Sequence, residues 1–164
     1  MGAIPRRLTL PALAVFLSWL LLIATIKVIS PEPDYSQNLP EECEEESLNC
    51  AGFGKWSHRT DEAGPVIFEG SMGEAGDSIR EWVSERDRST IVYSDNDTFH
   101  VVETTLFLRF EDDLVVHIEC SDGLTIVHGH SSSRIGISDL GVNPERLDSL
   151  ISHLEGYESS GSQC

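Results

Sequence analysis

The sequence predicts an α+β protein in which one N-terminal transmembrane helix precedes an antiparallel sheet of about four to six strands packed by two helices. Three observations lead to this fold class. A long uncharged segment opens the chain, several alternating strand patterns follow, and two helical patterns are interspersed with them. Because the order is strand, helix, strands, helix, we expect the two helices to cover one face of the sheet.

The first element is the apolar segment at residues 8–26, which contains no charge. As a helix it reaches about 28 Å, close to the ~30 Å hydrocarbon core of a bilayer. Arg6 and Arg7 precede it, and basic residues favour the cytoplasmic side. We therefore expect residues 1–29 to be a single-pass anchor in the cell membrane, with residues 8–29 in the lipid bilayer, the N-terminus cytoplasmic and the remainder extracytoplasmic. The alternative is a cleaved signal and a secreted protein.

The chain after the anchor is strongly acidic. All 28 acidic residues but only 8 of the 11 Lys and Arg residues follow position 30, so residues 31–164 carry 8 − 28 = −20 formal charges. Such a domain repels nucleic acid, which we exclude as a partner. The charge also opposes compaction, and salt screens that repulsion. A halophilic source and an acidic secreted domain from ordinary salinity explain this composition equally well.

Composition divides the remainder into three parts. We expect an acidic tether with Pro and Gly at residues 30–64, one α+β domain at residues 65–157 and a flexible tail at residues 158–164. The stretches PEPDYSQNLP and EECEEES are typical of extended, solvated chain. Phe53 and Trp56, near the end of the tether, could dock on the domain.

Within the domain, VIFEG at residues 66–70 predicts a short strand. Ser71 and Glu74 then form a capping box at the start of a helix. The apolar positions of that helix recur at helical spacing; they are Ala75, Ile79, Trp82 and Val83. Strands are predicted at residues 89–94, 98–110, 114–120 and 124–131, with turns at Asn96, Asp112-Asp113 and residues 121–123.

A second helix closes the domain. Asn143 is its predicted N-cap, Pro144 its first residue, and Gly156 its end. Its buried face is expected to consist of leucine and isoleucine at helical spacing; these residues are Leu147, Leu150, Ile151 and Leu154.

The four cysteines are Cys43, Cys50, Cys120 and Cys164. Outside the cytoplasm they can form disulfides, and a local bond between Cys43 and Cys50 is the most economical pairing. Cys120 continues the alternation of a strand, so we expect a buried free thiol. Cys164 is terminal and expected to be mobile. The spacing does not match a zinc site.

The end of the chain carries a family resemblance. Residues 131–154, SSSRIGISDLGVNPERLDSLISHL, resemble the closing signature S-R-x-G-x-S-D-L-G-V-N of the bacterial, archaeal and plastid family called domain of unknown function 1499. SLNC, with Cys43 before it, and LRFEDDLVVHI are also similar to segments of that family, so the resemblance covers about Cys43 to Leu154. Leu48 replaces a usual proline, and Pro144-Glu145 replaces basic residues. The resemblance implies no established activity and transfers no catalytic residue.

Residues 133–143, which we call the signature segment, combine five polar side chains that are candidates for ligand binding. These are Ser133, Arg134, Ser138, Asp139 and Asn143. In a structural interpretation Arg134 pairs with Asp112, Asp113 or Asp139. In a binding interpretation the segment forms a cradle in which Arg134 holds an anionic group. Hydrolysis by one of the serines has neither a nucleophile elbow nor an ordered Ser-His-Asp pattern to support it.

Histidines offer weak candidates for a metal site. His128 and His130 share one face of a strand, and His100, His117 or an aspartate would have to add a third ligand. Ordinary solvent-facing histidines explain the pattern better, so we expect neither a metal nor another cofactor. The sequence thus favours a membrane-anchored extracytoplasmic domain with a binding or envelope-support role centred on residues 134–143, acting on an unknown ligand or envelope protein. The alternatives are a hydrolase or metal-dependent enzyme using Ser, His and Asp residues of that region, and a purely structural envelope protein.

Overall fold

The computed structural model describes residues 6–36, 38–61 and 64–164. Residues 1–5 of the expected anchor and residues 37 and 62–63 of the expected tether lie outside that description. The elements in chain order are α1 (Arg6–Ile29), β1 (Cys50–Phe53), the 3-10 turn η1 (Gly54–Trp56), β2 (Val66–Phe68), α2 (Met72–Ser84), β3 (Ser89–Ser94), β4 (Thr98–Thr104), β5 (Glu111–Ser121), β6 (Leu124–Ser133) and α3 (Val142–Gly156).

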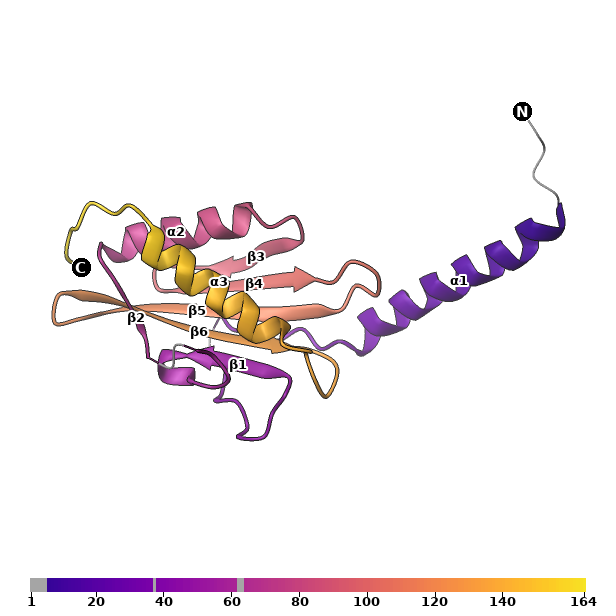
Figure 1. Ribbon diagram of the computed structural model, residues 1–164, viewed down its shortest axis with the longest axis horizontal. Helices are drawn as coiled ribbons and strands as arrows, with labels where there is room; N and C mark the ends of the chain where they lie inside the picture. The colour runs from indigo at the N-terminus through magenta and orange to yellow at the C-terminus, as the bar shows by residue number, and fades with distance from the viewer. Residues whose placement is uncertain (1–5, 37, 62–63) are drawn as a thin grey trace, which may run out of the picture.

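The six strands form one antiparallel sheet in the order β1-β6-β5-β4-β3, with β2 also paired to β6. Helices α2 and α3 lie side by side on one face of it, and α1 extends away from one end of the domain (Figure 1). The apolar core fills the space between these two helices and the sheet. This arrangement confirms the predicted α+β class and the number of strands.

Both core helices bury the residues that their spacing predicted. The capping box at α2 is present: Ser71 Oγ accepts from the Glu74 backbone N–H, and the Glu74 carboxylate accepts from the Ser71 N–H. The four apolar positions predicted for each helix are all buried. Helical periodicity was a reliable signal here because each stripe faces a sheet that excludes water.

Helix α1 contains one stretch, Leu10–Ile29, that is long and apolar enough to cross a membrane, with a mean hydropathy of 2.4. Only 6% of this stretch is buried against the rest of the chain. A signal sequence near an N-terminus has the same properties, so the helix fits either an anchor or a signal.

Part of the expected tether belongs to the sheet, and Phe53 and Trp56 dock on the domain as the sequence suggested. Strand β1 pairs with β6, and Phe53 and Trp56 are buried. The Phe53 ring lies against Gly129 of β6, where a Cβ would come within 2.2 Å of the ring. β6 therefore gains a partner strand and the core gains an aromatic ring. Glycine inside a strand was a signal for such a close approach.

Two strand boundaries also differ from the prediction. The strand expected at residues 98–110 ends at Thr104, and residues 105–110 form a loop in which Arg109 has a left-handed φ of 58°. Asp112-Asp113, predicted as a turn, lies inside β5 and is buried. Aspartate is rare in strands, but both carboxylates find arginine partners in the folded chain.

The cysteines form two disulfides, Cys43–Cys50 and Cys120–Cys164. The first is the local pairing that spacing favoured. The second corrects two expectations, because Cys120 is exposed and bonded rather than a buried thiol, and Cys164 is attached rather than free. The alternation of apolar and polar residues in β5 continues to Cys120. The last residues of the strand, however, extend beyond the core, so an apolar position there is not buried. The other domain boundaries stay predictions.

Candidate functional site

Arg134 follows β6 and is paired entirely with side chains of the domain. Its Nε and Nη2 donate to the two carboxylate oxygens of Asp113 at 2.8 Å, and its Nη1 donates to Glu111 Oε2 at 2.6 Å. The Arg134 side chain is only 4% exposed. Burial by itself raises the pKa of Asp113, but hydrogen bonds from Arg134 and His100 outweigh it, so that pKa lies below its usual value. Arg134 therefore pairs with one of its three expected partners.

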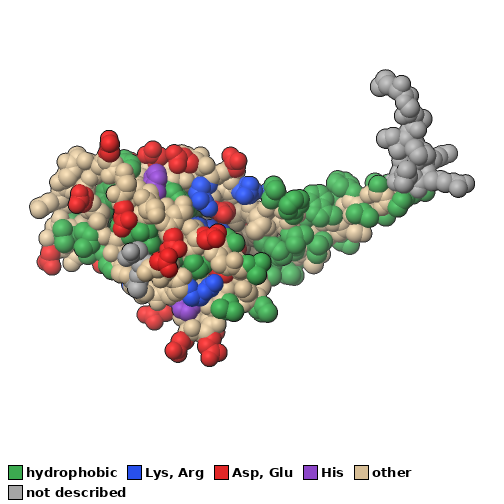
Figure 2. All heavy atoms as spheres, viewed as in Figure 1, with side chains coloured by type: hydrophobic (Ala, Val, Ile, Leu, Met, Phe, Trp, Pro, Cys, Tyr) green, Lys and Arg blue, Asp and Glu red, His purple; other side chains and the backbone are tan. Residues whose placement is uncertain are grey.

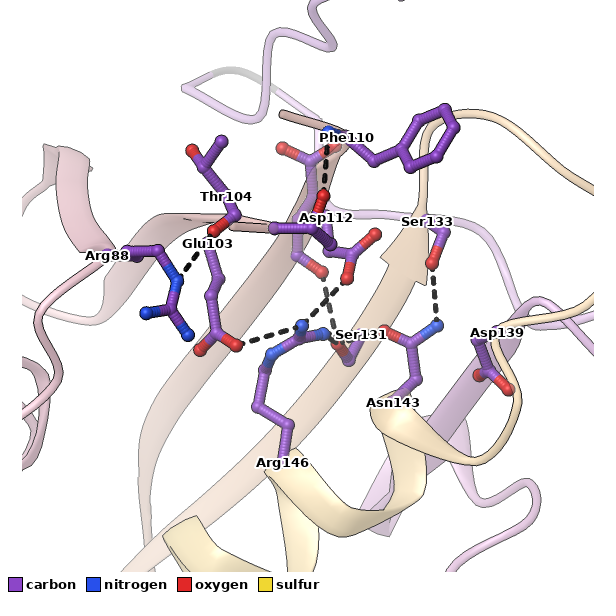
Figure 3. A network of polar contacts seen from close by, with 12 residues as sticks. Arg88, Glu103, Thr104, Phe110, Asp112, Ser131, Ser133, Asp139, Asn143 and Arg146 are labelled. Carbon is purple, nitrogen blue, oxygen red and sulfur yellow. Dashed lines mark hydrogen bonds and ion pairs between the residues drawn. The ribbon is translucent and has the colours of Figure 1, made fainter. Parts of the chain in front are cut away.

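Asp112 and Asp113 point to opposite faces of the sheet, as successive strand residues do. On one face Asp113 accepts hydrogen bonds from Arg134, and on the other Asp112 accepts from Arg146 Nη2 of α3 at 2.8 Å. Arg146 is buried and also contacts Glu103 Oε1 at 3.4 Å and Ser131 Oγ at 2.8 Å (Figure 3). Each aspartate of the pair thus has its own arginine.

Asn143 is not the N-cap of α3, contrary to the prediction. The cap position is Gly141, in the left-handed conformation at φ 88° and with no side chain to accept a hydrogen bond. Asn143 lies one residue inside the helix, fully buried. Its Oδ1 accepts from Ser131 at 2.8 Å and Arg146 at 2.6 Å. At this position the Asn143 amide bonds both β6, through Ser131 and Ser133, and Arg146 of α3.

Asp139 is held by Arg59, a residue of the expected tether. Arg59 Nη2 and Nη1 donate to its two carboxylate oxygens at 2.9 and 3.1 Å, and the Gly141 N–H donates to Oδ1 at 2.9 Å. Burial raises the pKa of Asp139, while the hydrogen bonds from Arg59 and Gly141 lower it, and the net pKa lies below its usual value. This pair fixes the signature segment to the chain before β2.

The two serines of the predicted site are bonded locally. Ser133 Oγ accepts from Asn143 Nδ2 at 3.3 Å, and Ser138 Oγ accepts from the Leu140 N–H at 3.3 Å. The five predicted ligand-binding residues are thus all bonded within the protein, with Ser133 and Asn143 bonded to each other. Their ligand-binding role stays a prediction, and their visible role is to hold the segment in place.

Next to these pairs is a cavity of about 480 Å³. The β4–β5 loop, the signature segment and the first turn of α3 surround it. Its lining residues are Thr105, Phe110, Asp112, Ser133, Ile135, Gly136, Ile137, Ser138, Asp139, Leu140 and Val142. The aliphatic and aromatic side chains among them make its wall mostly apolar. Its two carboxylates, Asp112 and Asp139, already face Arg146 and Arg59. The cavity can therefore take an uncharged apolar group.

Ser131, Ser133 and Ser138 do not form the arrangement that the hydrolase alternative needs. It requires a serine hydroxyl bonded to a histidine that is oriented by a carboxylate. A histidine–carboxylate pair exists, with His100 Nε2 2.6 Å from Asp113 Oδ1. The hydrogen bonds that place Ser131, Ser133 and Ser138, however, go to asparagine, arginine and backbone groups.

The histidines predicted as metal candidates lie on the sheet face opposite α2 and α3. His128 Nδ1 accepts from the Lys55 N–H at 3.0 Å. His130 Nε2 lies 3.1 Å from Cys50 Sγ, and burial lowers the pKa of His130 to about 4. Donor atoms of Cys43, Cys50 and His130 lie within 4.8 Å of one another. Because the two sulfurs are joined in a disulfide, they are not the thiolates that metal binding needs.

Sequence reasoning missed four charged residues of this site, which are Arg59, Glu103, Glu111 and Arg146. Arg146 had a signal, because Asn143, Arg146 and Leu147 fall on one face of the predicted helix. A charged residue in a buried stripe needs a buried partner. Arg59 had no local signal, since its partner is 80 positions away along the chain.

The comparisons with known proteins agree with the resemblance noted in the sequence. No curated protein and no solved structure matches the chain. The sequence model of one family, described as "Protein of unknown function (DUF1499)", matches residues 32–154. This match covers most of the chain, from before β1 to Leu154 in α3. It includes all the arginine pairs described above that hold the signature segment. The chain therefore belongs to the DUF1499 family of proteins of unknown function.

Proposed function

We propose that this protein is a membrane-anchored extracytoplasmic binding protein whose binding site is the cavity on the signature segment. The observation that carries the proposal is an open cavity of about 480 Å³ at this position. Small-molecule sites usually have volumes of roughly 300–1,000 Å³ and mostly apolar walls. A well-packed surface at the segment would have favoured a purely structural role instead.

Anchoring is supported by the apolar stretch of α1 and by Arg6 and Arg7 before it. Basic residues at this end favour a cytoplasmic N-terminus and an extracytoplasmic domain. Both disulfides of the domain are typical of oxidising compartments outside the cytoplasm.

The chemistry of the wall defines the class of ligand. Ile135, Ile137 and Val142 provide aliphatic surface, and Phe110 provides an aromatic ring. The nearby charges are satisfied within the protein, so a charged ligand would have to break a buried ion pair. The ligand is accordingly an uncharged apolar molecule or the hydrocarbon part of a larger one.

Native mass spectrometry of the full chain released from detergent tests this proposal, with dodecanol as the probe. We expect the wild type to retain one dodecanol and Val142→Trp, which fills the cavity, to lose it. Leu124→Trp is the matched control, because Leu124 is a similarly exposed apolar residue and begins β6. The β5–β6 turn beside it lies at the end of the domain opposite to α1 (Figure 1). Equal retention by wild type and Val142→Trp would contradict the proposal, and so would a wild type without dodecanol. Melting temperatures of all three proteins establish that each is folded.

A further inference from the structure

Four large apolar side chains project into solvent at one end of the domain. Leu106 and Phe107 of the β4–β5 loop are 60% and 73% exposed, and Ile137 and Leu140 of the signature segment are 94% and 93% exposed. We call these four residues the apolar rim, because Ile137 and Leu140 line the cavity and the loop of Leu106 and Phe107 borders it. Single exposed hydrophobic residues are normal, but a group of them indicates an interaction surface.

Backbone preference does not account for this surface. Leu140 has a left-handed φ of 55°, a conformation in which Asn and Gly are favoured over other residues. The left-handed conformation costs free energy for a leucine, and the exposed side chain of Leu140 gains no burial within the domain that would offset this cost. Its side chain is therefore better explained by a contact outside the domain.

The apolar rim lies at the end of the domain from which α1 extends (Figure 1). Trp19 Nε1 of α1 donates to the Phe107 backbone oxygen at 3.0 Å, and Lys27 pairs with Glu111 at 2.9 Å. Trp19 lies ten residues before Ile29, where the apolar stretch ends, a distance of about 15 Å along the helix. A helix that spans the bilayer thus brings the β4–β5 loop to the level of the acyl chains.

The distribution of charge on the domain also indicates that the apolar rim contacts the membrane. Residues 104–110 and 135–142 contain one basic residue, Arg109, and one acidic residue, Asp139, which is paired with Arg59. Hydrophobic side chains continue from α1 onto the adjoining edge of the domain, whereas acidic side chains are scattered over the remaining visible face (Figure 2). An acidic domain is repelled by anionic headgroups, so it can approach a membrane only through a charge-poor surface of this kind.

The β4–β5 loop also satisfies backbone groups that would otherwise be costly in hydrocarbon. The Thr105 N–H donates to the Phe110 oxygen, and the Phe110 N–H donates to Thr105 Oγ1, both at 2.9 Å. The Phe107 oxygen is the one that accepts from Trp19. These bonds close the loop at its base and at its tip.

From these observations we infer that the apolar rim inserts among the acyl chains of the adjacent membrane leaflet, so that the cavity borders lipid. The inference rests on the anchoring by α1 proposed above. It deepens the proposed function because it places the cavity where hydrocarbon chains can reach it directly.

Photocrosslinking of the full chain in phosphatidylcholine nanodiscs tests the inference, with a diazirine near the end of a phospholipid acyl chain as the probe. We expect lipid adducts on peptides containing residues 106–107 and 137–140 as well as on α1. No adducts are expected on the β5–β6 turn, although Leu124 beside it is 47% exposed. Phe107→Asp should lower the adduct yield on the 104–110 peptide by about tenfold or more, because a carboxylate is strongly disfavoured in hydrocarbon. The matched control Leu124→Asp should leave this yield unchanged.

Adducts confined to α1 would overturn the inference, as would equal yields on the rim and on the β5–β6 turn. An α1 without adducts would refute the anchoring itself, which is a separate failure. Val142→Trp distinguishes rim insertion from a lipid chain held in the cavity. A chain in the cavity would also give adducts on its lining residues Phe110 and Ile135, and the variant should remove these while the adducts on Phe107 remain. Loss of the Phe107 adducts in this variant would also overturn the inference.

Discussion

Polar and apolar residues alternate along the signature segment, yet they lie in opposite environments. Arg134, Asp139 and Asn143 turn inward, where each is bonded to a different part of the domain. Ile137 and Leu140, between them in sequence, project outward. The difference shows that the polar residues hold the loop while the apolar residues present a surface. Substitutions in the two groups should therefore affect different measurements.

The largest expected effect is on stability, from breaking the buried arginine pair. Arg134→Met leaves Glu111 without its arginine and Asp113 with only His100, and loss of one partner of a buried ion pair costs about 3–5 kcal/mol of unfolding free energy. Urea denaturation of the full chain in detergent measures it. Arg80→Met is the matched control, because the Arg80–Asp77 pair is exposed and such pairs contribute about 1 kcal/mol or less. Equal costs for the two variants would show that the inner polar residues do not hold the fold.

A second expected effect is a loss of stability in acid. The pKa values of Asp113 and Asp139 lie below the ordinary 3.8. Between the folded-state pKa and the ordinary pKa, the unfolded chain binds more protons than the folded chain. The stability that the two ionised carboxylates contribute is therefore present above the ordinary pKa and is lost as pH falls through the folded-state pKa. Urea denaturation between about pH 5 and about pH 3 measures the loss. Arg134→Met should show a smaller decrease than the wild type. An identical decrease would mean that Arg134 does not set the Asp113 pKa.

The smallest effect on stability is expected from the outward residues. Ile137→Ser combined with Leu140→Asn should change the unfolding free energy by no more than about 0.5 kcal/mol, as is usual for exposed positions. The same double variant should weaken dodecanol retention and remove lipid adducts from residues 137–140. A large fall in melting temperature would instead show that these side chains support the fold.

The sequence predicted the elements that depend on local chemistry. The capping box of α2 and the buried stripes of α2 and α3 were found because capping and helical periodicity involve residues within one or two turns. The strands β3, β5 and β6 were recognised by alternation, within a few residues at their ends. The polar composition of the site was also found. Its arrangement was not, because partners such as Arg59 and Asp139 are distant in sequence.

The remaining errors have one physical origin, which is that burial depends on what the rest of the chain covers. By itself the sequence determined the α+β class, the apolar N-terminal helix, the acidic charge and the family signature. Only the tertiary structure decided that residues 50–53 join the sheet, that Cys120 pairs with Cys164, and that Asp112 and Asp113 serve different arginines. It also decided that Asn143 is a buried link and that the apolar rim lies beside α1. Local patterns specify which residues need partners, whereas the packing of distant segments specifies which partners they receive.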